Sequence, residues 1–179
     1  CLTEKSVYFE SADEFIVDQF RNAGLDMTHT KEKDYSKSTT YRIPNKQIMG
    51  ILSDLKLLGS KSENKFIPEV YKWGTIEERW AILQGLMDTD GSVTKSAGEF
   101  VSISKQLAED VQFVARSLGA SATMTEKDTF YKDKEGNKVE CNTAYRVRIK
   151  LPDASMLFRL PRKKEKVIPF NGGTSEVCR

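Results

Sequence analysis

The sequence predicts an α+β protein that contains one structural unit twice. Short stretches of alternating apolar and polar residues indicate strands, and longer stretches with apolar residues three and four positions apart indicate helices. The order strand, helix, strands, helix occurs in both halves, and each half ends with the tetrapeptide Lys-x-Ile-Pro. The 179 residues suffice for one large domain or two small fused ones.

The first half begins with a strand at SVYFE and a helix in SADEFIVDQFRNAGL, for which Ser11 is the expected N-cap and Gly24 the C-terminal stop. A second strand is expected at TYRI. A second helix follows in NKQIMGILSDLKLLG, with Asn45 as its cap and Gly59 as its stop.

The second half opens with a helix from Thr75 to Asp88, in which Thr75 and Glu78 have the spacing of a capping box. A strand in GEFVSISK and a helix in KQLAEDVQFVARSLG are expected next. A hairpin that turns at Asp133 to Asn137 follows, and DASMLFRL is expected to form the last helix.

The two halves can be aligned. LTEKSVYFESADEFIVDQFRNAGL corresponds to VTKSAGEFVSISKQLAEDVQFVARSLGA, TYRI to AYRVRI, and KFIP to KVIP. Because Leu2 then pairs with Val93, the first-half counterpart of AILQGLMDTDG is expected to lie before Cys1.

Composition excludes several classes of protein. With 28 basic and 26 acidic residues the net charge is only +2, so a nucleic-acid partner requires a local basic surface. Three cysteines without a CxxC pair argue against a disulfide framework and a zinc site, and the single histidine, His29, leaves little material for histidine-based catalysis. No membrane span or signal peptide is visible. We expect an intracellular protein of the cytoplasm or nucleoid, with no membrane partner.

The segment AILQGLMDTDGSV contains a helical glycine that calls for an explanation. Gly85 costs about 1 kcal/mol relative to alanine inside a helix. Ala81, Gly85, Asp88 and Thr89 are expected to share one stripe, along which a second helix approaches closely. The sequence therefore predicts a partner helix at this face.

The aspartates Asp88 and Asp90 face the unfavourable, negative end of the helix dipole, so a cationic group is expected nearby. Two such carboxylates from paired helices would repel each other unless a divalent ion lay between them, and hard oxygen ligands favour Mg²⁺. An alternative is a simple C-cap with Gly91 in the left-handed conformation. An EF-hand is excluded, because the remaining ligands of its loop are missing.

A basic row is expected on one strand. In YRVRIK, alternation places Arg146, Arg148 and Lys150 on one face and Tyr145, Val147 and Ile149 on the other. Such a row suits DNA phosphates or the major groove, although an ordinary solvated sheet face is the alternative. PRKKEK resembles a nuclear-localisation patch but suits a loop beside DNA or a solvated surface. The other candidate DNA-binding residues are Arg42, Lys46, Lys31, Lys33, Lys37 and Lys95.

LQGLMDTDG resembles the signature of the LAGLIDADG homing endonucleases, in the DOD form found inside inteins. EERWAILQGLMDTDGSV, FVSISKQLAEDVQFVARSLG and both Lys-x-Ile-Pro segments agree with that family. The resemblance implies a pseudo-twofold αββαββα fold, with two antiparallel sheets that form a saddle over DNA. It implies that two LAGLIDADG helices pack through Gly85 and Ala81, and that Asp90, rather than Asp88, is the metal ligand.

The same resemblance implies metal-dependent hydrolysis of one phosphodiester on each strand of a long double-stranded DNA site, with Mg²⁺ or Mn²⁺ as cofactor. Lys65 and Lys166, one in each half, would assist Asp90. Residues 1–74 would form a first repeat without its LAGLIDADG helix, 75–170 a second repeat with that helix at 75–90, and 171–179 an exit linker.

The chain departs from the family in two respects. The first LAGLIDADG helix and its acidic residue are missing, so another part of the precursor, or another chain, is expected to supply them. The splicing blocks of an intein are also missing, and Cys1 is better explained as the start of a strand segment than as a splicing nucleophile. The alternative function is a DNA-binding or maturase-like LAGLIDADG module that no longer cleaves.

Overall fold

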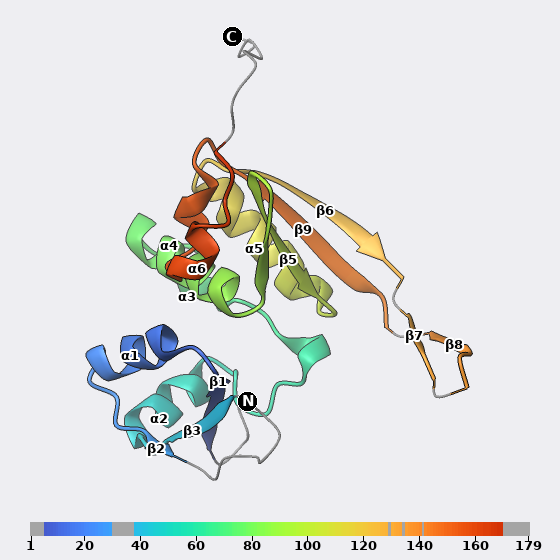
Figure 1. The fold of residues 1–179 in the computed structure, drawn as a ribbon. Coiled ribbons are helices and arrows are strands. Elements are labelled where there is room, and N and C mark those ends of the chain that lie inside the picture. Colours follow the sequence, from blue (N-terminus) through green and yellow to red (C-terminus); the bar gives the residue numbers. More distant parts are fainter. Residues whose placement is uncertain (1–5, 30–37, 129, 134, 141, 170–179) are drawn as a thin grey trace. The chain divides into compact units, whose positions relative to one another are not determined.

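The computed structural model describes residues 6–29, 38–128, 130–133, 135–140 and 142–169 (Figure 1). The chain forms two compact units, Cys1–Lys61 and Ser62–Arg179. The division lies earlier than the boundary expected between residues 74 and 75, because Ile67 is buried in the core of the second unit. None of the helices in the described residues has the length and hydropathy required to cross a bilayer.

The first unit is a three-stranded antiparallel sheet, in the order β1-β3-β2, with two helices. The ring of Phe9 stacks on Phe20 at a centroid distance of 4.3 Å and on Tyr41 at 5.0 Å, which gives the small unit an aromatic centre. The elements are β1 (Val7–Ser11), α1 (Glu14–Asn22), β2 (Thr28–His29), β3 (Thr39–Ile43) and α2 (Lys46–Asp54).

Two helix ends in this unit differ from the expectation. The N-cap of α1 is Asp13, not Ser11, because the Ser11 hydroxyl accepts the N–H of Asp13 and so ends the strand. Helix α2 ends before Gly59, because Lys56, the residue after the C-cap Leu55, takes the left-handed conformation with φ 57°. A lysine thus occupies the position usually held by a C-terminal glycine.

The second unit contains the complete order αββαββα, with a 3-10 helix and a short α-helix at its end. Strand β4 was not predicted, and η2 replaces the helix expected in DASMLFRL. The predicted β7–β8 hairpin is present and projects beyond the sheet (Figure 1). The elements are η1 (Ser62–Asn64), α3 (Glu69–Lys72), α4 (Ile76–Thr89), β4 (Gly91–Thr94), β5 (Ala97–Ser102), α5 (Lys105–Ser117), β6 (Ser121–Lys127), β7 (Phe130–Lys132), β8 (Lys138–Glu140), β9 (Ala144–Lys150), η2 (Ala154–Leu157) and α6 (Pro161–Lys164).

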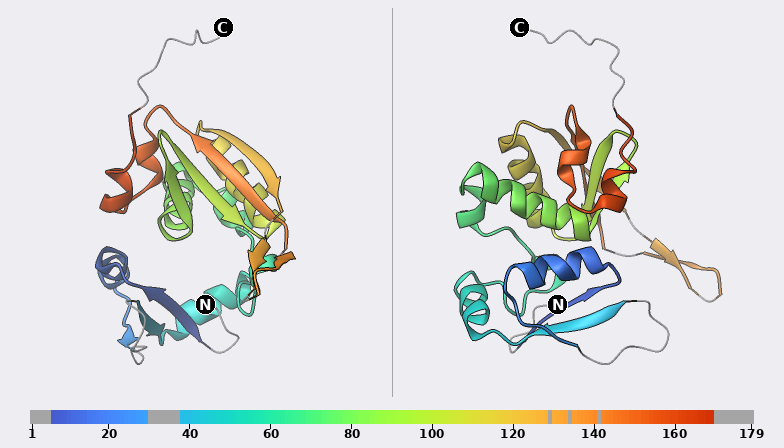
Figure 2. Two further views of the ribbon diagram at one scale, coloured as in Figure 1. Left: turned by 45° about the vertical axis from the view of Figure 1, so that its right-hand side comes forward. Right: turned by 60° about the vertical axis from the view of Figure 1, so that its left-hand side comes forward.

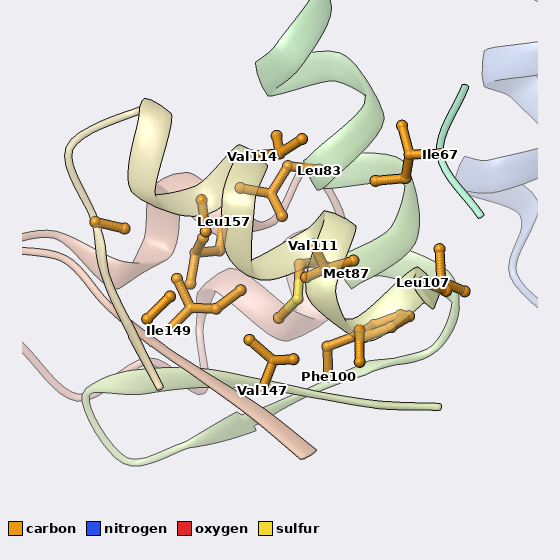
Figure 3. Close-up of a cluster of buried hydrophobic side chains, with 14 of the residues drawn as sticks. Ile67, Leu83, Met87, Phe100, Leu107, Val111, Val114, Val147, Ile149 and Leu157 are labelled. Carbon is orange, nitrogen blue, oxygen red and sulfur yellow. The ribbon is translucent and has the colours of Figure 1, made fainter. Parts of the chain in front are cut away.

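The core of this unit lies between its helices and one face of the antiparallel sheet β4-β5-β9-β6. Helix α5 covers β5, β9 and β6, as both views of Figure 2 show. Leu83 and Met87 of α4 lie in one buried cluster with Val111 of α5 and Val147 of β9 (Figure 3). The side of α4 that carries Leu83 and Met87 is therefore packed into the core of the second unit.

Both units use the same sheet pattern, which confirms the repeat read from the sequence. The antiparallel order β1-β3-β2 corresponds to β5-β9-β6. In each unit an arginine of the central strand lies opposite a threonine of the last strand: Arg42 opposite Thr28, and Arg148 opposite Thr123. Tyr8 of β1 lies opposite Arg42 and Glu99 of β5 opposite Arg148, and the alignment of the two halves pairs Tyr8 with Glu99, so Arg148 is the counterpart of Arg42.

Candidate functional site

Helix α4 begins as the sequence predicts. The Thr75 hydroxyl accepts the N–H of Glu78 at 3.2 Å, and the Glu78 carboxylate accepts the N–H of Thr75 at 2.8 Å, which completes the capping box. Leu83 and Met87 have no exposed surface. The helix that carries both aspartates is therefore well anchored at its start and along one side.

The uncovered face of α4 consists of Ala81, Gly85 and Thr89, all exposed. A Cβ added to Gly85 would meet no atom within 4 Å. Asp88 was expected on this stripe, but it is only 7% exposed and lies on the buried side of the helix. Within the described residues, the close-packing partner expected at Ala81 and Gly85 is not present.

Gly91 is required for a reason other than the one the sequence suggested. It is not among the described residues with a positive φ, so the simple left-handed C-cap is wrong. A Cβ at Gly91 would lie 2.6 Å from the carbonyl oxygen of Met87. Glycine is needed here because β4 leaves the helix in contact with its last turn.

The two glycines predict opposite responses to alanine. Gly85→Ala is expected to raise the free energy of unfolding of the isolated chain by about 1 kcal/mol, because the new methyl group meets no neighbour and alanine favours the helix. Gly91→Ala is expected to lower it by about 1–3 kcal/mol through overpacking against Met87. Urea denaturation measures both, and changes of the same sign would contradict this account.

Asp88 has a structural role. Its carboxylate accepts the N–H of Arg159 at 3.0 Å and that of Leu160 at 3.2 Å, at the entry to α6. These bonds compensate for the burial of the charge. Asp88 therefore joins α4 to the segment before α6, and its oxygens are already engaged.

Asp90 lies at the C-cap of α4 and is exposed. Its backbone N–H donates to the Leu86 carbonyl at 3.0 Å, which closes the last turn. Its carboxylate makes no hydrogen bond or ion pair within the described part of the chain. Of the two aspartates, Asp90 is thus the one with oxygens available to an external ligand.

The cation expected at the end of α4 is Lys163, which the sequence analysis did not identify. Lys163 is 8% exposed. Its ammonium donates to the carbonyl oxygens of Met87 at 2.8 Å, Asp88 at 2.7 Å and Gly91 at 2.6 Å. PRKKEK is therefore not merely a solvated basic loop, since one of its lysines is a buried partner of the helix end.

The side chains of Lys65 and Lys166 are exposed, and the backbone of each lysine is held by a hydrogen bond. The Lys65 carbonyl accepts the Ser104 hydroxyl at 2.6 Å, and the Lys166 N–H donates to the Lys163 carbonyl at 3.2 Å. Both lysines belong to the second compact unit together with Asp90, although Lys65 closes the first half of the sequence. Their roles beside Asp90 stay a prediction.

The predicted basic row is present on β9. Arg146, Arg148 and Lys150 alternate with the buried Val147 and Ile149. Arg148 and Lys150 are exposed, and hydroxyl side chains of β6 lie opposite the row. These hydroxyl residues are Thr125, Thr123 and Ser121.

Arg146 differs from the other two cations of the row. Its Nε lies 3.3 Å from Oε1 of Glu99 on β5, close enough for an ion pair, but the Nε–H is not directed at the oxygen and makes no hydrogen bond. Glu99 thus places a negative charge beside the basic row of β9.

The remaining candidate cations are dispersed. Arg42 and Lys46 are exposed and line one surface pocket of the first unit. Lys95, with φ 55°, is exposed in the β4–β5 turn. Lys31, Lys33 and Lys37 lie outside the described residues, as does the expected exit linker at 171–179.

Comparison with known structures identifies the fold. The homing endonuclease I-DmoI in complex with DNA and Ca superposes with a TM-score of 0.54 at 16% identity, over 89% of this chain and 81% of that chain. A structure of mesophilic I-DmoI variants gives 0.53 at 15% identity, over 85% and 76%. The chain has the LAGLIDADG homing endonuclease fold.

The sequence comparisons agree with this LAGLIDADG fold. Residues 77–150, from the start of α4 to the end of β9, match the LAGLIDADG-like domain family model. The Homothallic switching endonuclease of Saccharomyces cerevisiae is 31% identical over 120 residues, which are 63% of this chain and 20% of that protein. The chain thus spans about a fifth of the length of this curated relative.

The match includes Asp90 and the β9 row but ends before Lys163 and Lys166. Sequence reasoning missed two anchoring residues: Lys163, and Asp110 of α5, whose buried carboxylate accepts the N–H of Ile67 at 2.8 Å. Asp110 had a detectable signal, because it interrupts the apolar face of α5 between Leu107 and Val111. Lys163 had none, because a basic run normally indicates a solvated surface.

Proposed function

We propose that the chain is part of a site-specific LAGLIDADG homing endonuclease, carried by an intein, that hydrolyses double-stranded DNA. The observation that carries the proposal is the exposed carboxylate of Asp90 at the end of α4, which has no partner among the described residues. The helix is held in a buried core, so the carboxylate is presented from a rigid support.

The donor set fits a divalent ion shared with DNA. Among the described residues, no group of three or more His, Cys, Asp and Glu side chains is arranged to hold a metal ion. Mg²⁺ is usually bound by one or two carboxylates together with substrate phosphates and water, so one carboxylate from this chain is sufficient. A second carboxylate, from a helix that packs on Ala81 and Gly85, would complete the protein's share.

The chain's own residues would then act as follows. Asp90 would hold Mg²⁺ or Mn²⁺, and the bound ion would supply Lewis-acid stabilisation at the phosphate and lower the pKa of a bound water. The exposed ammonium groups of Lys65 and Lys166 stabilise the negative charge that develops on the scissile phosphate. The cations of β9 and of β3 bind the phosphates and base edges on either side of the cut.

The proposal is tested on randomised double-stranded DNA with the natural protein that contains this chain. With Mg²⁺ present, sequencing of the cut ends is expected to return double-strand breaks at one long site, and chelation of the metal is expected to abolish them. Selective binding of one DNA sequence without cleavage would instead indicate a DNA-binding or maturase-like module. The intein assignment predicts splicing blocks in the coding sequence that flanks this chain.

Arg148 gives a quantitative test of the DNA face. Arg148→Ala is expected to weaken binding and to reduce the slope of log K against log[salt] by about one, because one phosphate contact is lost. The control is Lys105→Ala, which removes one positive charge from the start of α5, on the other side of the sheet. An equal effect of the two changes would show that only net charge matters.

A further inference from the structure

The end of α4 is held by an ammonium whose contacts enclose the proposed metal ligand. The three carbonyls bound by Lys163 belong to Met87 and Asp88, before Asp90, and to Gly91, directly after it. We infer that Lys163 is the positioning residue for Asp90, because its ammonium fixes the backbone on both sides of that carboxylate. This inference rests on the proposed function.

The match between donor and acceptors is specific. The last carbonyls of a helix have no partner within the helix, and they form the negative end of its dipole. An ammonium has three N–H donors, and three carbonyls receive them at 2.6 to 2.8 Å. Because Lys163 is 8% exposed, water competes little for these bonds, and the chain cannot turn at Asp90 without breaking them.

A second connection runs in the opposite direction. The Asp88 carboxylate of α4 accepts the N–H groups of Arg159 and Leu160, while Lys163 of α6 reaches back to the carbonyls of α4. Each segment therefore holds the other by a charged side chain bound to backbone. Together the two connections define where Asp90 leaves the helix.

Lys163 acts through Asp90 and not on DNA. Its ammonium is buried and bonded to carbonyls, in contrast with the exposed Lys164 and Lys166 beside it. Removing it should therefore leave DNA affinity intact and displace the carboxylate. A displacement of about 1 Å at a catalytic group costs on the order of a hundredfold in rate.

The test compares Lys163→Met, which keeps side-chain length but has no donor, with Lys164→Met, which removes the same charge from an exposed position of α6. In the metal-free protein, amide hydrogen exchange of Asp90 and Gly91 is expected to accelerate in Lys163→Met relative to the amides of β9, and to stay unchanged in Lys164→Met. This readout separates local release of Asp90 from a general loss of stability.

The same two variants are then assayed for DNA cleavage. Lys163→Met is expected to lower the turnover rate about a hundredfold and to raise the Mg²⁺ concentration for half-maximal cutting, with unchanged DNA affinity in chelator. Unchanged exchange at Asp90 and Gly91, or unchanged cleavage while the wild type cuts, would overturn the inference. Absence of cleavage by the wild type would refute the proposed function instead, and the exchange comparison would still decide whether Lys163 fixes Asp90.

The exchange rates of Lys163→Met are informative only if that variant folds. Asp88→Asn therefore provides a second variant, because it weakens the other connection between α4 and α6. It is expected to give the same local acceleration at Asp90, to a smaller extent. Protection at Asp90 equal to that of the wild type in Asp88→Asn would count against the inference.

Discussion

Replacing Asp90 with asparagine is expected to abolish metal-dependent DNA cleavage and to leave DNA binding intact. The carboxylate is exposed, and no described residue neutralises it. Loss of groups that merely support a metal ligand costs about 10- to 100-fold, so loss of the ligand itself should lower the rate by more than about a hundredfold. Initial rates of double-strand cutting with Mg²⁺, and affinity in chelator, measure the two properties separately.

The free energy of unfolding of Asp90→Asn should rise, although its cleavage activity is lost. Asp90 is a negative charge at the negative end of the α4 dipole, which the Lys163 ammonium offsets in part, so Asp90→Asn is expected to stabilise the chain by up to about 1 kcal/mol. Asp88→Asn provides the contrast, because it replaces a buried carboxylate that accepts backbone N–H groups and should destabilise the chain. Full cleavage by Asp90→Asn would refute the assignment of Asp90 as metal ligand.

Local signals in the sequence predicted much of this site. The capping box of α4 and the alternation in β9 each depend on residues a few positions apart, and both are present in the structure. The repeat was also readable, because each unit must satisfy the same helix starts and strand order. Sequence reasoning separated Asp88 from Asp90 by resemblance, and the structure adds a physical difference, since Asp88 is buried and Asp90 is exposed.

Contacts between residues distant in the sequence could not be predicted in the same way. Lys163 reaches Gly91 across 72 positions, and nothing in PRKKEK distinguishes the buried lysine from its exposed neighbours. Strand β4 was missed because its four residues, GSVT, are too few to show a period. The Lys-x-Ile-Pro that closes the first half of the sequence lies in the second compact unit, because Ile67 is buried in the core of that unit.

The second large effect is expected on replacing Asp110 of α5, which binds the first Lys-x-Ile-Pro segment. Asp110 is 3% exposed. Its carboxylate accepts the N–H of Ile67 at 2.8 Å, the ammonium of Lys72 at 2.9 Å and the side-chain amide of Gln106 at 3.0 Å. Asp110→Ala would leave the Ile67 N–H without its acceptor and the largely buried Lys72 with only its surface partner, Glu69. We expect a loss of about 3–5 kcal/mol in the free energy of unfolding.

The pH dependence of this loss follows from Lys72. Its pKa is raised above the usual 10.5, first by the hydrogen bond to Glu69 and further by that to Asp110, against the lowering effect of burial. A raised lysine pKa contributes stability that is complete below its unfolded value and is lost as the pH rises through the folded value. On the alkaline side, the difference between wild type and Asp110→Ala should therefore stay constant from neutral pH upward and begin to shrink above about pH 10.5.

Urea denaturation of Asp110→Ala, beside the exposed neighbour Glu109→Ala as control, measures the effect. Glu109→Ala should change the free energy of unfolding by no more than about 0.5 kcal/mol. Because Lys65 lies two residues before Ile67, loss of the Asp110 contact should also release the Lys65 backbone and slow cleavage in conditions where the variant is still folded. Equal stability of the two variants would show that this buried carboxylate does not fix the segment, and the anchor left for Lys65 among the described residues would be the Ser104 hydroxyl.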